Sequence, residues 1–393
     1  MLTEPESTSG RSVATGSAAK MPMVLHPRVV TGSGGGPDKT ILNSPRFLRS
    51  LGYDSACMYL RPPNDPGFEA IRARAEELGA PLEEIDDRGA ADWRVLSRAL
   101  EVCRRLDVRV WHGHDYKTNL MGLLLRRWRP MRLVTTVHGW VHHTSRTPLY
   151  YKLDRWALKH YERVICVSPD LLEECSEIGV REDRRLLIEN AIDCKQFRRR
   201  RSPGEARQAL GLPADGFLIG GVGRLSPEKG FDVLVRSVAR LHVLGMKPML
   251  AILGDGDQRT ALQSLIDTAG LGAHARLMGF QSNTREWFEA MDLFALSSLR
   301  EGLPNVALEA MAVETPVVAT RVAGVPRLIQ DGRSGLIVPI GDEEALSGAI
   351  CQLITDPRMR ADIAANGRRV IEDQYNFSSR MEKIRDVYAS LGV

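Results

Sequence analysis

The sequence lacks several features that would assign it to a particular class of protein. Its six cysteines are scattered, with no Cys-x-x-Cys pair, a pattern that fits a reducing cytoplasm better than a disulfide framework. No apolar run is long enough to span a bilayer. The formal net charge is only +4, from 53 basic and 49 acidic residues, which gives little reason to expect nucleic acid as a partner. We therefore expect a cytoplasmic protein whose partners are not nucleic acids.

The length of the chain and its local composition predict how it is divided. The first 20 residues are rich in Ser, Thr, Gly and Ala without an apolar segment, so they predict a disordered leader rather than a signal peptide. At 393 residues the chain is too long for one ordinary core, and two domains are expected. The run Arg198–Arg201, followed by Pro203 and Gly204, marks the break, and we interpret it as a solvated linker face. The expected units are the leader (1–20), a first domain (21–195), a second domain (196–374) and a C-terminal helical segment (375–393).

Short apolar runs alternate with helix-period segments from about Pro27 to the end of the chain. Many of these runs are continuous and end in Gly, His or Ser, as expected for parallel strands buried on both faces. They are HPRVVTG, DVRVWHG, LVTTVHG, RVICVS, GFLIGGVG, PMLAILG, ARLMGF, DLFALSS and TPVVAT. The clearest amphipathic helix follows GRLSPEKG, where Phe231, Leu234, Val235, Val238 and Leu241 recur at helical spacing. This alternation predicts the α/β class, with two Rossmann-like doubly wound domains that face a cleft.

The glycine-rich loop TGSGGGPDKT after the first strand fails two nucleotide-binding motifs. A Walker P-loop would need Gly where Asp38 stands, and a dinucleotide fingerprint would need Gly or Ala where Pro37 stands. What remains is a turn without side chains, Gly32–Gly36, before a helix expected to start near Asp38 or Lys39. The free N–H groups of such a helix start can hold an anion. The alternative is a tight turn with no ligand, but three consecutive glycines favour close approach of a ligand.

The second half carries charged residues at the expected ends of its strands. Arg224 follows one strand directly and Lys229 stands at the entry to a helix, where two cations suit a diphosphate. Glu301 is expected in a loop and Glu309 in a helix, because Pro304 suits a first helical turn. Carboxylates accept hydrogen bonds from the vicinal hydroxyls of a sugar. Taken one at a time, each of these residues would more often be an ordinary surface charge.

Together these segments resemble the family-4 (group 1) retaining glycosyltransferases of the GT-B fold. The resemblance covers nearly the whole chain from Gly32 onward and is strongest from Gly221 to Pro339. It depends on the order GRLSPEKGFDVL, GDGDQR, DLFALSSLREGLPNVALEAMA, TPVVATRVAGVPRLI and DGRSGLIVP. In the first half it depends on the shorter matches GSGGGPDKT, WHGHDYKTN, TTVHGW and VICVSPDLLEE. Arg327 departs from the pattern, since the family commonly has Glu there.

The resemblance implies a role for each charged residue named above. Arg224 and Lys229 would hold the pyrophosphate of a nucleotide-sugar donor. Glu309 would bind the ribose hydroxyls, and Glu301 the hydroxyls of the transferred sugar. The remaining donor contacts implied are Gly302, Leu303 and Asn305 near the sugar and β-phosphate, Gly34 and Gly35 from the first domain, and Gly279, Phe280 and Gln281 near the base.

Five histidines crowd two strand ends of the first half, namely His112, His114, His138, His142 and His143. With Asp115 they suggest zinc, but they occupy two separate junctions without the spacing of a zinc motif, so we expect no metal site. His138 ends an apolar strand, and the resemblance implies that it lies beside the donor sugar. We therefore take His138, Arg224, Lys229 and Glu301 as candidate catalytic residues. The alternative for His138 is a strand-capping residue bonded to local backbone.

The function implied by the resemblance is a metal-independent transfer of a hexosyl unit with retention of configuration. The donor would be a GDP- or UDP-sugar, with no further cofactor, and the acceptor a glycan, a lipid-linked molecule or a small molecule. The first domain would receive the acceptor, the second the donor, and the last helix would cross back onto the first domain. Two alternatives on the same architecture are a sugar-nucleotide 2-epimerase, which lacks the paired EKG and Glu-x7-Glu elements, and a catalytically silent sugar-nucleotide-binding subunit.

A basic stretch in the first half suggests where the protein resides. Arg126, Arg127, Trp128, Arg129 and Arg132 would allow peripheral contact with anionic lipid at the inner membrane face, which would suit a lipid-linked acceptor. The alternative is a solvated helix end before the strand at Leu133.

Overall fold

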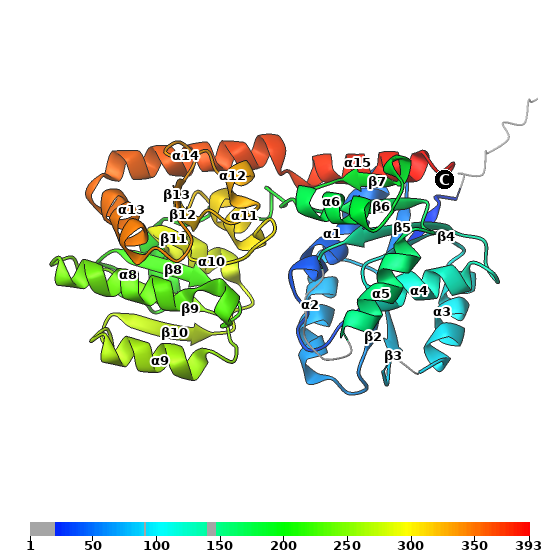
Figure 1. Ribbon diagram of the computed structural model, residues 1–393, viewed down its shortest axis with the longest axis horizontal. Coiled ribbons are helices and arrows are strands. Elements are labelled where there is room, and N and C mark those ends of the chain that lie inside the picture. The colour runs from blue at the N-terminus through cyan, green and yellow to red at the C-terminus, as the bar shows by residue number, and fades with distance from the viewer. Residues whose placement is uncertain (1–19, 90–91, 140–146) are drawn as a thin grey trace, which may run out of the picture.

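The computed structural model describes residues 20–89, 92–139 and 147–393 of the chain. Two parallel sheets form two domains that lie side by side, with two consecutive helices running along one side of both (Figure 1). Apart from Lys20, the leader expected over residues 1–20 lies outside the described residues. Among the described residues, no helix combines the length and apolar character needed to cross a membrane.

The first domain is built on a seven-stranded parallel sheet. Its strands, in spatial order, are β3 (Leu82–Asp86), β2 (Asp54–Arg61), β1 (Met23–Val29), β4 (Val108–Gly113), β5 (Arg132–Val137), β6 (Arg163–Cys166) and β7 (Arg185–Leu187). Its helices are α1 (Gly36–Ser50), α2 (Glu69–Leu78), α3 (Arg94–Arg105), α4 (Tyr116–Leu125), α5 (Thr147–Leu158) and α6 (Pro169–Glu177). Adjacent residues of β1 serve opposite faces, because Leu25 packs with α3 and α4 while Val24 packs with α1 and α15 (Phe377–Ala389). Burial on both faces explains the continuous apolar runs of the sequence.

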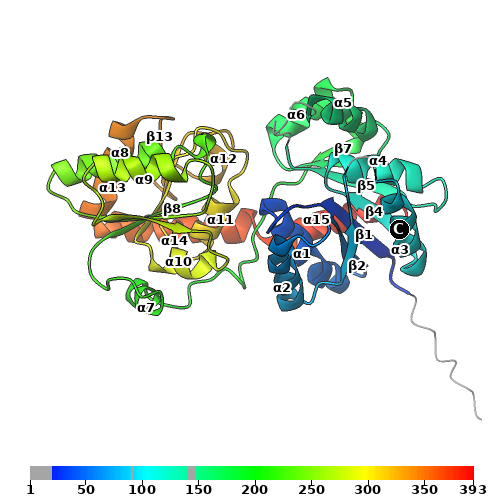
Figure 2. The same cartoon turned by 90° about the horizontal axis from the view of Figure 1, so that it is seen from below.

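The second domain repeats this architecture with six parallel strands. Their spatial order is β10 (Ala275–Gly279), β9 (Met249–Leu253), β8 (Leu218–Val222), β11 (Leu293–Leu296), β12 (Val317–Thr320) and β13 (Leu336–Val338). The helices are α7 (Pro203–Ala209), α8 (Phe231–Val243), α9 (Arg259–Thr268), α10 (Thr284–Ala290), α11 (Asn305–Ala312), α12 (Val325–Leu328), α13 (Glu343–Thr355) and α14 (Pro357–Gln374). In Figure 2, α8, α9 and α13 lie on one side of this sheet and α10 and α14 on the other. The predicted α/β class with two doubly wound domains is confirmed.

Each strand-like run of the sequence forms a strand, and the predicted apolar stripe of α8 is buried. Strands β2, β3, β7 and β13 were not predicted from the sequence. Edge strands β3 (LEEID) and β7 (RLL) are polar or only three residues long, so they carry no continuous apolar run. The expected start of the first helix near Asp38 or Lys39 was wrong, since α1 begins at Gly36. The fixed φ of Pro37 suits the first turn, and the Asp38 carboxylate accepts the N–H of Gly35 there.

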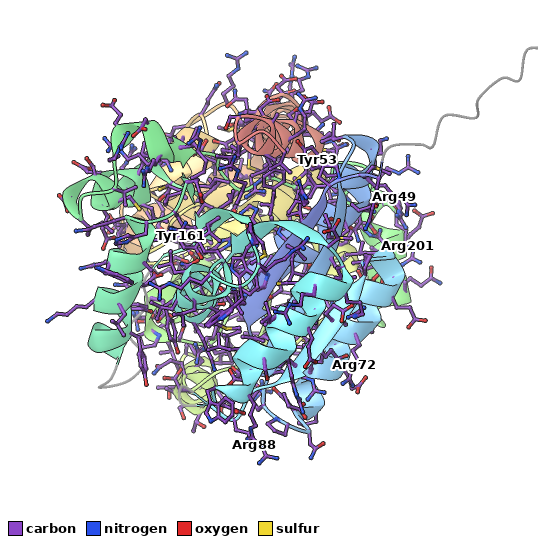
Figure 3. All side chains as sticks on the ribbon, turned by 90° about the vertical axis from the view of Figure 1, so that its right-hand side faces the viewer. Arg49, Tyr53, Arg72, Arg88, Tyr161 and Arg201 are labelled. Atoms are coloured by element: carbon purple, nitrogen blue, oxygen red, sulfur yellow. The ribbon has the colours of Figure 1, made fainter. Side chains whose placement is uncertain are left out.

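The chain passes between the domains twice, and the two passages lie side by side. The linker after β7 meets the start of α15 through a bridge between Ile192 and Asn376. From there α15 returns to the first domain, where Tyr388 is fully buried beside Tyr53 with ring centroids 5.4 Å apart. Figure 3 views the first domain from its outer side and shows Tyr53 next to this helix. The C-terminal helix is therefore part of the core of the first domain, as its apolar residues in that core show.

Candidate active site

The loops that follow β8 and β9 pack against each other at the carboxyl edge of the second sheet. The N–H of Leu225 donates to the carbonyl of Asp255 at 3.0 Å. A side chain at Gly254 or Gly256 would strike the backbone of the β8 loop. These two glycines are thus required by the close approach of the loops. This packing places Arg224, whose side chain is exposed, at the same sheet edge as the GDGDQR turn.

Lys229 and Glu301 form an ion pair at this edge. Lys229 ends a short 3-10 helix (Pro227–Lys229), and Glu301 stands in the loop before α11, as expected. The hydroxyl of Ser298 also donates to the Glu301 carboxylate, at 2.9 Å. The side chain of Lys229 is 22% exposed and that of Glu301 is 14% exposed, so a ligand can reach both and take the place of the ion pair. A phosphate can take the place of the carboxylate on Lys229, and sugar hydroxyls can take the place of the ammonium on Glu301.

Glu309 lies one turn inside α11 and its side chain is only 1% exposed. It pairs with Lys39, which extends from α1 of the first domain, and accepts a hydrogen bond from the hydroxyl of Thr284 at 2.8 Å. A buried carboxylate is stable only with such partners. Pro304 is the N-cap of α11 with a ψ of 109°, so its expected position in the first turn was wrong. Glu309 nevertheless lies in the helix, as predicted.

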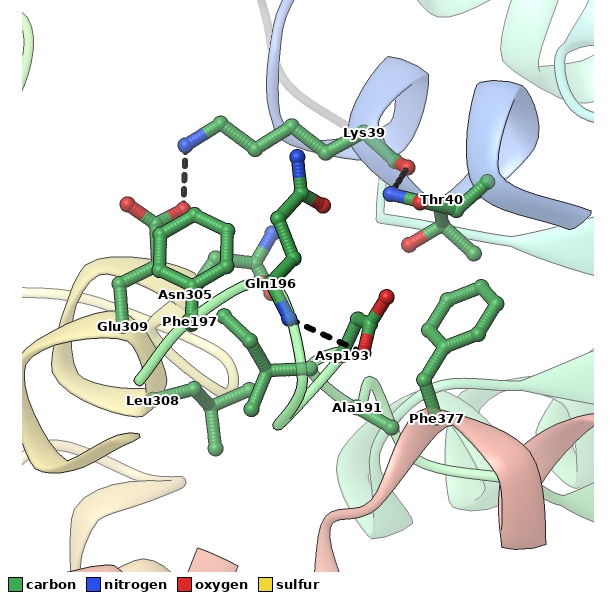
Figure 4. Close-up of a pocket in the computed structure, with 12 residues that line it drawn as sticks. Lys39, Thr40, Ala191, Asp193, Gln196, Phe197, Asn305, Leu308, Glu309 and Phe377 are labelled. Atoms are coloured by element: carbon green, nitrogen blue, oxygen red, sulfur yellow. Dashed lines mark hydrogen bonds and ion pairs between the residues drawn. The ribbon is translucent and has the colours of Figure 1, made fainter. Parts of the chain in front are cut away.

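The starts of α1 and α11 meet at the interface between the domains. A Cβ atom added to Gly36 would lie 2.8 Å from the side-chain amide of Asn305, the first residue of α11. Figure 4 shows a small pocket here, with Lys39 reaching across to Glu309. Its lining comes from both domains and from the linker, for example Asn305, Asp193 and Gln196. Two helix N-termini with free N–H groups therefore point into one region.

The glycine turn after β1 is explained partly by contacts within the chain. Gly34 has a φ of +73°, and a Cβ there would lie 2.6 Å from Oδ2 of Asp38. Gly36 is required by its contact with Asn305 in the other domain. At Gly35 the nearest atom to an added Cβ is 4.0 Å away, so this position leaves room for a ligand. The N–H of Gly35 is engaged by Asp38 at 2.6 Å, and Arg28 pairs with the same carboxylate.

The other predicted donor residues occupy different environments. Phe280 follows β10 and is 61% exposed, whereas Leu303 is buried before α11. Gly302 lies against Gly324, whose missing side chain allows the loops after β11 and β12 to touch. Gln281 donates to the carbonyl of Met278 at 2.9 Å, which fixes the loop near the expected base position. These placements leave the assigned roles as predictions.

Three histidines form a chain at the carboxyl edge of the first sheet. Nδ1 of His114 lies 3.2 Å from Nε2 of His138, and Nε2 of His114 lies 3.2 Å from Nδ1 of His26. Burial, together with a smaller effect of the charge of Arg380, lowers the pKa of His26 to about 3. Burial likewise holds the pKa of His114 and His138 well below the usual range. All three rings are therefore neutral near pH 7, and the described side-chain bond of His138 runs to another histidine.

His112 stacks on His114 but stays outside this chain. The two rings lie 4.8 Å apart and only 11° from parallel. The nitrogens of His112 face the hydroxyls of Tyr388 at 2.6 Å and Thr136 at 2.8 Å. His26, His112 and His114 offer a donor set of the kind that binds metals. However, nitrogen lone pairs lie in the ring planes, so nearly parallel stacked rings do not converge on one ion. The geometry favours hydrogen bonds, and the absence of a metal site stays a prediction.

Several members of these clusters carry no signal in the sequence. His26 stands inside an apolar strand, and Lys39 and Arg380 stand on helices whose partners come from distant segments. His142 and His143 lie outside the described residues. Asp115, the acidic residue beside His114, is the N-cap of α4 and accepts the N–H groups of Thr118 and Val29. It therefore has a structural role.

Comparison with known proteins decides the family. Residues 204–370 match the family model described as glycosyl transferases group 1, and residues 34–196 match that of glycosyltransferase family 4. The chain belongs to the group 1 glycosyltransferases. Its two matched segments fall in the two domains, and the structure has the GT-B fold of this family.

Three similar proteins of bacterial origin show how far this likeness extends. The chain is 35% identical over 228 residues to the lipopolysaccharide core biosynthesis glycosyltransferase LpsE of Rhizobium meliloti, covering 58% of this chain and 63% of that protein. It is 26% identical over 312 residues to the Escherichia coli UDP-Gal:alpha-D-GlcNAc-diphosphoundecaprenol alpha-1,3-galactosyltransferase, covering 77% and 80% of the two chains. Anabaena Alr3699/HepE, solved in complex with UDP and glucose, has a TM-score of 0.80 at 21% identity, covering 94% and 100%. This last likeness shows the fold alone.

Proposed function

We propose that this glycosyltransferase moves a hexosyl unit from a nucleotide-diphosphate sugar to a glycan, lipid-linked or small-molecule acceptor, with retention of configuration and without a metal ion. The observation that carries the proposal is the meeting of α1 and α11. Their N-termini approach each other at the contact of Gly36 with Asn305. Lys229 pairs with Glu301 in the loop before α11, and Arg224 follows β8 at the carboxyl edge of the same sheet. Helix N-termini and cations together stabilise the negative charge of a departing diphosphate.

Donor binding would exchange the partners of two carboxylates. Glu309 would release Lys39 and accept the ribose hydroxyls, and Glu301 would release Lys229 for the phosphates and accept sugar hydroxyls. A UDP-sugar is the donor we favour over a GDP-sugar. One relative is named for UDP-Gal, and a protein of the same fold was solved with UDP and glucose. The leaving phosphate would then assist removal of the proton from the acceptor hydroxyl.

The acceptor would enter a hollow at the carboxyl edge of the first sheet. It has a volume of about 620 Å³, and its lining includes Leu60, Pro62 and Tyr116 beside the ion pair of Lys117 and Asp87. Apolar walls suit the lipid part or the ring faces of an acceptor.

Contact with the inner membrane face belongs to the same proposal. Trp128 is 58% exposed beside Arg127 at the end of α4, where it can insert at a lipid headgroup layer. Arg129 and Arg126 are paired with Asp107 and Glu162, which reduces the positive charge available for lipid.

Thermal unfolding with nucleoside diphosphates tests the donor site. In EDTA, UDP at saturating concentration should raise the melting temperature of the wild type more than GDP does. Arg224→Ala and Glu309→Ala should lose that shift, whereas Arg276→Ala, which removes an exposed cation of β10, should keep it. The product of a preparative reaction then shows by NMR whether the anomeric configuration of the donor is retained. The absence of any nucleotide shift from a folded wild type would refute the proposal.

A further inference from the structure

The three-histidine chain can carry its protons in only two ways. His114 stands in the middle, with His138 at one end and His26 at the other. A neutral imidazole has one N–H and one bare nitrogen, so each ring-to-ring bond needs one donor and one acceptor. All the N–H groups of the chain therefore point either toward His26 or toward His138.

The buried end of the chain determines the direction. Nε2 of His26 is buried and has no hydrogen-bond partner among the described residues. Arg380 of α15 is buried as well, and its charge acts on both His26 and His138. This guanidinium contacts neutral groups, the carbonyl of Glu189 at 3.1 Å and the sulfur of Met381 at 4.0 Å. In the field of a cation a bare nitrogen is stabilised, and an N–H without an acceptor is destabilised. Nε2 of His26 is thus the nitrogen without a proton.

We propose that His26 and His114 are positioning residues that fix which nitrogen of His138 carries its proton. With Nε2 of His26 bare, its Nδ1–H donates to Nε2 of His114. The Nδ1–H of His114 then donates to Nε2 of His138. The proton of His138 is left on Nδ1, the nitrogen outside the chain. This inference rests on the proposed function and on the role that the family resemblance implies for His138, beside the transferred sugar.

A fixed N–H on His138 has a defined use in glycosyl transfer. Negative charge builds on the departing phosphate oxygen, and the hydroxyls of the sugar need partners in set directions. A neutral imidazole held in one tautomer donates one hydrogen bond without requiring a full charge at the site. With the proton on Nε2, the outer nitrogen would present a lone pair, which repels a phosphate oxygen. Loss of tautomer control over an active-site histidine is known to reduce turnover strongly.

The tautomer is measurable without any sugar donor. In wild-type protein labelled with ¹⁵N-histidine, two-bond ¹⁵N–¹H correlation spectra identify the protonated nitrogen of each ring. The signals of His138 are assigned by their loss in His138→Gln. We expect His26, His114 and His138 all to carry the proton on Nδ1. A wild-type His138 protonated on Nε2 would overturn the proposal.

Two substitutions of His114 separate positioning from packing. His114→Gln offers an amide oxygen to His26 and an amide N–H to His138, so it should keep the tautomer of His138. His114→Phe keeps a ring stacked on His112 but removes both bonds. It should give a mixture of tautomers at His138 and lower kcat at least about tenfold, with donor KM changed less than about twofold. Thr136→Val is the matched control, since it removes a buried hydroxyl bonded to His112 outside the chain and should leave kcat within about twofold.

Each remaining outcome supports or overturns the proposal. A kcat for His114→Phe within about twofold of the wild type would overturn it. If His114→Phe does not fold, the wild-type spectrum and the spectrum of His114→Gln still test the proposal. An Nε2–H form of His138 in His114→Gln would contradict the proposed control of its tautomer. One zinc ion per molecule of purified protein, lost in His114→Gln, would also overturn the proposal. Failure of the proposed function would appear separately, as no stabilisation by UDP while the Nδ1–H form of His138 is observed.

Discussion

Lowering the pH from 7 to about 5.5 is expected to destabilise the first domain, because its histidine cluster cannot accept protons while folded. Burial lowers the pKa of His26 to about 3 and holds those of His112 and His114 well below the usual range. In the unfolded chain these rings regain a pKa near 6.5. Below that pH the unfolded state binds more protons than the folded state, so the free energy of unfolding falls as pH falls. The contribution is fully present above about pH 6.5 and is lost toward the low pKa of the folded protein.

The magnitude follows from the number of rings. A histidine that stays neutral in the folded state contributes about 1.3 kcal/mol of destabilisation between pH 7 and 5.5. His26, His112 and His114, which are at most 7% exposed, together give about 4 kcal/mol, and His138, whose pKa burial also lowers, brings the total to about 5 kcal/mol. Ordinary carboxyl groups titrate near pH 4, below this window. Because a domain is stable by only about 5–15 kcal/mol, the expected loss is a large fraction of the total.

Urea unfolding at the two pH values, at constant ionic strength, measures this loss. Trp287 is the one tryptophan of the second half, and the other five stand between residues 93 and 156. Tryptophan fluorescence of a Trp287→Phe background therefore reports on the first domain. His112→Gln in this background removes one of these four rings and should reduce the loss by about a quarter. His160→Gln, which replaces an exposed histidine, should leave it unchanged. A loss below about 1 kcal/mol, or an equal loss in His112→Gln, would refute the reasoning.

Three further substitutions test contacts that join the two domains or the two ends of the chain. Lys39→Met leaves Glu309 without its cation, so it should lower the melting temperature but enlarge the stabilisation by saturating UDP; an unchanged nucleotide shift would contradict this. Ile384→Ala on α15 should destabilise the first domain by about 2–5 kcal/mol in urea unfolding, and an effect confined to the second domain would contradict the packing of this helix. Arg327→Ala breaks a partly exposed pair with Glu189 and should change the free energy of unfolding by less than about 1 kcal/mol, which the same titration checks.

The parts of the fold that could be predicted from the sequence are those with a strong local signal. Continuous apolar runs predicted the buried strands, and helical spacing predicted the buried face of α8. Pro304 predicted the start of α11 to within a residue, since its φ fits there and its missing N–H is not needed. The outer strands β3 and β7 could not be predicted from the sequence. Each pairs with a neighbouring strand on one side only, so its residues need not follow a regular apolar pattern.

Contacts between distant segments had no local signal. The arginine run after the linker was interpreted as a solvated face, which was wrong for Arg199, because its guanidinium donates to the carbonyls of Glu289 and Glu314. His26 is one of two polar residues of β1, with Arg28, and nothing in the sequence linked it to His114. The charged residues at the edge of the second sheet were predicted to form one site because their motifs occur in the order typical of the family. Their binding roles stay predictions.

The two acidic residues of the candidate donor site differ in where their cations come from. Glu301 is paired within its own domain, so exchanging Lys229 for sugar hydroxyls requires no movement between domains. Glu309 is paired with Lys39 of the other domain, so ribose hydroxyls can reach it only if that contact opens or shifts. With the proposed roles of these two residues, binding of the nucleotide would be coupled to the arrangement of the domains, whereas binding of the sugar would not. A nucleoside diphosphate alone should then alter the interface as much as the complete nucleotide sugar does, and a free hexose should leave it unchanged.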